Sequence, residues 1–174
     1  LNPGNTFNDT ADENSAATHA ELMRQAAKLG IDIPFLGSDT LDDNMVLEAI
    51  KGTDLKLYVS TFYQEGGSPE FDEGIKAWLN EDATAMTNNG GNDTIAAVTA
   101  MGYDAYYVAL EALKAAGSTD KAAVKAALPD VTYTGVSGSI AFDEQGDAIR
   151  DTAYIKTADT ANNAWALETM QKAG

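Results

Sequence analysis

The chain has 174 residues, of which 44% are hydrophobic, and its 27 acidic and 11 basic side chains give a formal charge of -16. This apolar fraction is enough for a folded core. The acidic balance argues against nucleic acid and anionic membrane surfaces as partners, because both would repel the chain. The absence of cysteine excludes disulfides, thiol catalysis and cysteine-ligated zinc. The sequence contains no run of about 18 apolar residues that would predict a membrane-spanning helix.

The first elements predict a ligand-binding turn. Residues 1–17 are polar with few large apolar side chains, so we expect a loop there. A helix with apolar residues at helical spacing follows, and Gly30 stands where a left-handed C-terminal cap would end it. The apolar run 31–36 predicts a buried strand, from which the chain turns toward Asp39 at the edge where open α/β sheets bind ligands. The apolar face of the helix would consist of Leu22, Met23, Ala26 and Leu29.

Cap residues and apolar spacing predict the remaining elements. Ser68 followed by Pro69 is typical of a helix start, and Gly117 and Pro129 are expected to end two later helices. Residues 80–93 are polar and predict a loop. The predicted helices span 45–50, 69–79, 94–116 and 122–128, and the predicted strands span 55–60, 136–142, 153–157 and 165–170, with 143–147 as a turn.

Three stretches carry a resemblance to a known family. They are the segment 22–39, which contains LMRQA and IPFLGSD, the segment 100–118, which contains MGYDAY and LEALKAAGS, and the segment 134–147, TGVSGSIAFDEQGD. They stand in family order and lie within residues 20–157. On these motifs the chain resembles the type 1 periplasmic binding proteins, specifically the branched-chain amino-acid (Leu/Ile/Val) receptors of ABC importers.

The resemblance implies an α/β fold with flavodoxin-like parallel-sheet lobes, of which this chain is the C-terminal part of a two-lobed receptor. Residues 1–95 would belong to the second lobe, 96–149 would return to the first lobe, and 150–174 would cross back. The family normally has one more helix and strand ahead of the first predicted helix. A unit of about 20 residues is therefore expected to be missing near 8–14, as is the first half of the receptor. A missing N-terminal fragment or another chain would then cover an exposed sheet edge.

The family also implies a function by binding. It implies an extracytoplasmic protein, either in the periplasm or anchored as a lipoprotein at the cell surface, with its export signal removed. Such a protein closes over a small amino acid and delivers it to the membrane subunits of an ABC permease. No enzyme activity, metal or cofactor is implied. The residues agree, because the sequence has no nucleophile elbow, phosphate loop or Ser-x-x-Lys motif, and its single histidine, His19, leaves no triad.

Five residues are candidate ligand contacts. In the resembling receptors the acidic residue after the Phe-Leu-Gly strand, here Asp39, accepts hydrogen bonds from the ligand ammonium group. Ser38 precedes it, Thr61 and Phe62 end the next strand at the cleft, and Tyr103 stands where an aromatic ring closes over the ligand. The alternatives are that Asp39 caps the turn or the following helix, that the tyrosine is a core residue, and that 61 and 62 form an ordinary loop.

Other interpretations stay open at this point. Tyr106 and Tyr107 are further aromatic candidates. The same fold serves as the sensor domain of receptors and of amide-responsive regulators, which would change the partner but not the pocket. Asp39, Asp42 and Asp43 could alternatively form the divalent-ion or phospho-acceptor site of a small flavodoxin-like domain, although acidic residues at a helix start more often interact with the helix N-terminus.

Overall fold

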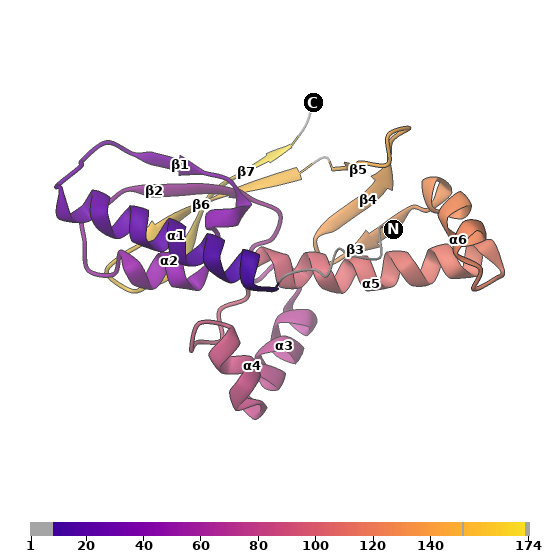
Figure 1. Cartoon of the computed structure of the whole chain (residues 1–174), viewed down its shortest axis with the longest axis horizontal. Coiled ribbons are helices and arrows are strands. Elements are labelled where there is room, and N and C mark those ends of the chain that lie inside the picture. Colours follow the sequence, from indigo (N-terminus) through magenta and orange to yellow (C-terminus); the bar gives the residue numbers. More distant parts are fainter. Residues whose placement is uncertain (1–8, 151, 173–174) are drawn as a thin grey trace.

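The computed structural model describes residues 9–150 and 152–172, and in it helices and two sheets form an elongated α/β arrangement (Figure 1). No helix in these ranges is long and apolar enough to span a membrane. The helices are α1 (Asp9–Lys28), α2 (Asn44–Ala49), α3 (Pro69–Glu81), α4 (Ala83–Asn88), α5 (Ala97–Ala116) and α6 (Lys121–Ala127), with short 3-10 turns η1 (Asp39–Leu41) and η2 (Leu128–Asp130). The strands are β1 (Phe35–Gly37), β2 (Leu57–Thr61), β3 (Tyr133–Gly135), β4 (Gly138–Phe142), β5 (Ala148–Ile149), β6 (Thr152–Asp159) and β7 (Ala164–Lys172).

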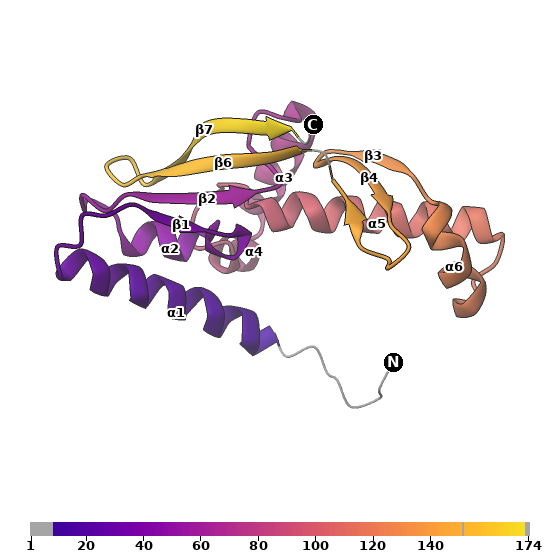
Figure 2. The ribbon, with the colours of Figure 1, turned by 90° about the horizontal axis from the view of Figure 1, so that it is seen from above.

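The larger sheet has the strand order β1-β2-β6-β7 (Figure 2). β1 and β2 are parallel, as the helix between them requires, whereas β6 and β7 form a hairpin whose first strand pairs antiparallel with β2. The sheet is therefore mixed, with a parallel pair at one side and an antiparallel pair at the other. Its strands come from two stretches of sequence that are far apart.

Helices α1 and α2 cover one face of this sheet and bury its main core. The buried residues of β2 alternate with half-buried ones, because side chains of a strand point to opposite faces in turn. The apolar face of α1 matches the prediction only in part: Met23 and Ala26 are buried as expected, whereas Leu22 is exposed and Leu29, just past the helix end, is 77% exposed. The core consists of Ala20, Met23, Ala26, Val46, Ile50, Leu55, Leu57 and Val59.

Among the described residues up to 93, three secondary-structure predictions were wrong. The loop predicted over 1–17 is helical from Asp9 onward, where it forms the first part of α1; residues 1–8 lie outside the described part. The predicted strand 31–36 forms only at its end, as β1. The predicted loop 80–93 contains α4, which Asp82 caps by accepting hydrogen bonds from two backbone amides.

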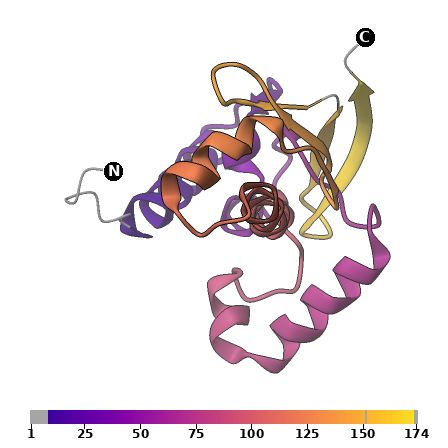
Figure 3. The same ribbon diagram turned by 90° about the vertical axis from the view of Figure 1, so that its right-hand side faces the viewer.

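The second sheet, β3-β4-β5, packs with α5 and α6 around a separate core. The strand predicted over 136–142 is in fact the second strand of a hairpin, since the chain turns between Gly135 and Gly138. At 138 the backbone has φ +104°, which glycine adopts without strain. In Figure 3, which looks almost along α5, α3 and α4 lie apart from α6, on another side of α5.

Candidate functional site

Four of the five predicted contacts lie at one edge of the larger sheet. β1 and β2 are parallel with Gly37 opposite Val59, so the two strands end at the same edge. Ser38 and Asp39 follow β1 directly, and Thr61 and Phe62 end β2 and follow it. The carboxyl ends of parallel strands are where α/β sheets place their ligand contacts.

Among the residues that the structure describes, none pairs with the Asp39 carboxylate. The residue is half-buried at the start of η1, and no described hydrogen bond or ion pair engages its side chain. The capping task suggested as an alternative is performed by Asp43, whose carboxylate accepts a hydrogen bond from the Met45 amide at 2.6 Å at the start of α2. The hydroxyls of Ser38 and Thr40, the residues before and after Asp39, lie 2.9 Å apart. A charged acceptor thus remains available at the sheet edge.

Asp42, the third acidic residue of this turn, is buried in an ion pair. Its carboxylate accepts hydrogen bonds from the Lys156 ammonium at 2.9 and 3.2 Å and from the Thr61 hydroxyl at 2.7 Å. Of the three carboxylates that could have formed a metal or phospho-acceptor site, Asp42 is therefore held by Lys156 and Thr61, and Asp43 caps α2. Within 9–150 and 152–172, no group of three histidine, cysteine or acidic residues could hold a metal ion.

Thr61 lies at the predicted edge but is fully buried, and its hydroxyl is used by Asp42. The Phe62 ring instead lies under the Arg150 guanidinium, with 5.2 Å between the guanidinium carbon and the ring centre. Arg150 also donates to the backbone oxygen and hydroxyl of Ser137, each at 3.1 Å. Sequence reasoning missed Arg150 and Lys156, because each acts on residues far away along the chain.

Asp104 is a further buried carboxylate that the sequence did not single out. It accepts hydrogen bonds from the amides of Val136 at 2.9 Å and Ser137 at 2.8 Å, and from the Ser137 hydroxyl. Ser137 also accepts hydrogen bonds from Arg150, and the Arg150 guanidinium lies over the Phe62 ring. These contacts connect the α5 helix, the β3–β4 turn and the end of β2. This connection runs between the two sheets.

Tyr103 belongs to a different cluster from the other four candidates. It lies on α5, is 39% exposed, and its ring centre is 5.0 Å from that of Phe71 and 4.9 Å from that of Tyr107. Its hydroxyl donates to the Tyr107 hydroxyl at 3.4 Å, and this bond, followed by desolvation, raises the pKa of Tyr103 to about 12. The Tyr107 ring stacks on the Tyr133 ring with 6.0 Å between their centres, and the Tyr106 ring packs edge-on against that of Tyr107. Tyr103 lines a hollow of about 380 Å³ between α3 and α5.

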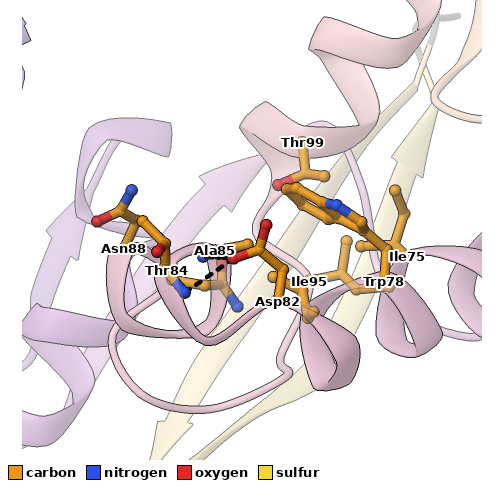
Figure 4. A pocket seen from close by; sticks show the side chains of 10 residues that line it. Ile75, Trp78, Asp82, Thr84, Ala85, Asn88, Ile95 and Thr99 are labelled. Atoms are coloured by element: carbon orange, nitrogen blue, oxygen red, sulfur yellow. Dashed lines mark hydrogen bonds between the residues drawn. The ribbon is translucent and has the colours of Figure 1, made fainter.

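A second hollow, of about 480 Å³, lies between α3 and α4 (Figure 4). Ile75, Leu79 and Ile95 give it an apolar lining, and the Trp78 indole stands beside it. Figure 4 shows the Asp82 carboxylate turned toward its own helix start, where it accepts from the amides of residues 84 and 85 at 2.8 and 3.0 Å. This carboxylate is already used as a cap, so we place the candidate site at the sheet edge and not here.

Comparisons with known proteins agree with this arrangement. The family model described as periplasmic binding protein matches residues 14–163. A search of curated protein sequences finds no significant match. Among solved structures, the leucine-binding protein LivK of Thermotoga maritima is similar with a TM-score of 0.66 and 27% identity, over 90% of this chain and 42% of its own.

Two further structures share the fold. An ABC transporter substrate-binding protein of Desulfitobacterium hafniense in complex with Leu has a TM-score of 0.56 and 24% identity, over 84% of this chain and 39% of its own. One from Sphaerobacter thermophilus has a TM-score of 0.63 and 22% identity, over 91% and 43%. The chain thus spans less than half the length of the structures it matches.

Proposed function

Because the chain belongs to the periplasmic binding protein family, we propose that it acts in an extracytoplasmic solute-binding protein of an ABC importer that captures a branched-chain or similar small amino acid. The family and its solved relatives are ligand-binding proteins and not enzymes. The leucine named for the Thermotoga protein and for one Desulfitobacterium structure supports the ligand class. The partners in this proposal are the amino acid and the membrane subunits of the permease.

The observation that carries the proposal is the Asp39 carboxylate where β1 and β2 end, which no described residue engages. A carboxylate accepts several hydrogen bonds and carries a full negative charge, so it suits the ammonium group of an amino acid. Among its neighbours, Asp42 and Asp43 are used internally. Asp39 is therefore the acidic residue of this turn that is left to bind a ligand.

The other candidates differ in how directly they would act on the ligand. Ser38 and Phe62 flank Asp39 at the edge, with the hydroxyl as a polar contact and the ring as an apolar one. Thr61 supports the site from beneath through Asp42. Tyr103, which lies on α5, would contact the ligand from the other side when the lobes close.

The division into lobes is part of the same proposal. Residues up to 95 would form the second lobe, 96–149 would belong to the first lobe, and 150–174 would return to the second. Its support is that the larger sheet is built from strands on either side of 96–149, while the elements α5 to β5 form a separate sheet and core.

Calorimetric titration with leucine, isoleucine and valine tests the function on the protein as its gene encodes it. Asp39→Ala removes a charge-assisted hydrogen bond to a buried cation, which costs about 2 to 4 kcal/mol, or roughly 30- to 1000-fold in Kd. The matched control is Asp43→Ala. Loss of that cap costs about 1 kcal/mol of stability and leaves the Kd nearly unchanged.

The opposite pattern would reject the role of Asp39. If Asp39→Ala bound leucine as tightly as the original protein but melted at a lower temperature, Asp39 would be a structural residue. If the unmodified protein bound none of the three amino acids, the ligand class itself would be wrong.

A further inference from the structure

The Lys156–Asp42 pair is unusual because both charges are almost completely shielded from water. The side chains are 3% and 1% exposed, and the closest nitrogen–oxygen distance is 2.9 Å. Lys156 lies on β6 opposite Val59 of β2, beside the apolar core under α1 and α2. An apolar side chain at 156 would serve this core at least as well, since a buried ion pair often stabilises a fold no more than apolar residues of similar volume.

What the pair does is hold one short turn at a fixed place. The Asp42 carboxylate is held by Lys156 from β6 and by the Thr61 hydroxyl from β2. Two neighbouring strands therefore fix the turn that follows a third strand. A side chain held by three directed hydrogen bonds has little freedom to shift.

This turn also carries Asp39. The Asp42 amide donates to the Asp39 backbone oxygen at 3.0 Å, and the Leu41 amide donates to the Ser38 oxygen at 3.1 Å. The turn lies tightly against β1, because a Cβ atom built at Gly37 would come within 2.9 Å of the Leu41 side chain. A displacement of Asp42 would consequently displace Asp39.

Removing Lys156 would leave a carboxylate buried without its counter-ion. Such a group is strongly unfavourable, and the chain can relieve it by moving the carboxylate out to water. Here that movement means opening the turn 38–42. The position of Asp39 at the sheet edge thus depends on a lysine that lies beneath it.

We propose that Lys156 and Thr61 are positioning residues for the ligand-binding carboxylate, and that they act through Asp42 without touching the ligand. This inference rests on the proposed function, because it assigns a task to the support of the same site. It predicts that affinity for the amino acid depends on a residue of β6 that is shielded from solvent.

The test combines leucine titration with hydrogen exchange of the backbone amides of 39–43. For Lys156→Met we expect exchange there to be about tenfold faster and the leucine Kd about tenfold weaker, with exchange in α5 unchanged. The matched control is Lys56→Met, which changes an exposed lysine beside β2. It should leave both measurements as they are.

A milder pair of variants covers the case in which Lys156→Met does not fold. Thr61→Val removes one hydroxyl at nearly constant volume and should weaken leucine binding about threefold while speeding exchange at 39–43. Thr61→Ser keeps the hydroxyl and should restore both values. A general loss of stability would instead raise exchange throughout the sheet. In that case Thr61→Ser would not restore exchange at 39–43 selectively.

The failures of the two proposals are distinguishable. If the unmodified protein binds no amino acid, the proposed function is wrong, and the exchange data still report whether the turn is held. If the protein binds leucine and Lys156→Met leaves both the affinity and the exchange at 39–43 unchanged, the positioning role is overturned. Where Lys156→Met does not fold, the same result for Thr61→Val overturns it.

Discussion

At the scale of single residues, Gly135 and Asp104 show how closely a backbone approaches a buried carboxylate. A Cβ atom built on Gly135 would overlap the Asp104 carboxyl group. That carboxylate is fully buried on α5 and accepts from the amides of Val136 and Ser137. Glycine at 135 is thus required by the proximity of α5 to the β3–β4 hairpin.

We therefore predict that Gly135→Ala destabilises the chain by about 2 to 3 kcal/mol, because the methyl group must displace a carboxylate that has no access to water. Gly102→Ala is the matched control. Gly102 lies within α5 with open space where its Cβ would stand, so alanine should stabilise by about 0.5 to 1 kcal/mol. Urea unfolding of both variants measures the difference, and equal stabilities would contradict the packing described here.

The buried Tyr63 gives a pH dependence with a definite sign. Its hydroxyl donates to Asp72 at 2.6 Å, and burial and this carboxylate raise the pKa of Tyr63 above its ordinary value of 10.0. The raised pKa means that the folded state favours the neutral phenol. Its contribution to stability is complete below about pH 10 and is lost as the pH rises toward the folded-state pKa.

Unfolding free energies between pH 8 and 11.5 should accordingly fall above about pH 10. Tyr63→Phe should cost about 1 to 2 kcal/mol at pH 8, because it removes the hydrogen bond to a buried carboxylate. It should also make the alkaline decline shallower. Some decline would remain, since the pKa of Tyr103 is raised to about 12. An identical pH profile for the two proteins would show that Tyr63 does not titrate in this way.

At the scale of elements, the sequence predicted best where helix ends are determined locally. Pro69 begins α3, and Gly117 ends α5 with φ 58°, both as predicted. Each of these signals acts within one helical turn. They are therefore visible in the order of residues alone.

Strand limits and the faces of elements were less predictable. Leu36 satisfies a strand pattern, yet it is 78% exposed, because its neighbour Phe35 packs on the core and successive side chains of a strand point to opposite faces. In the site, Asp39 could be predicted from its place after a strand. The contacts that hold its turn, from Lys156 and Thr61 to Asp42, could not be predicted. Lys156 and Asp42 are 114 positions apart, and only the pairing of β2 with β6 brings them together.

At the scale of the whole molecule, the free edge of β1 bears on association. Among the described strands, β1 pairs only with β2, and Leu36 on β1 and Ile33 just before it are both exposed. Unpaired edges with apolar side chains favour pairing with another chain. Light scattering after size exclusion should thus show mass increasing with concentration.

Leu36→Lys should reduce this association, because a charged side chain on an edge opposes pairing. Leu113→Lys, on α5 away from this sheet, is the control and should leave the association unchanged. A mass that stays monomeric at every concentration for the unmodified chain would show that this edge does not recruit a partner.

The mixed sheet also has a consequence for the time course of synthesis. β2 lies at the centre of the sheet, and its contact with β6 joins residues 100 positions apart, such as Leu57 and Thr157. At about 5 to 20 residues per second, β6 emerges from the ribosome roughly 5 to 20 s after β2. Until then Asp42 has no Lys156 to neutralise it. The early part of the nascent polypeptide should therefore stay open to chaperones or to a translocation channel during this interval.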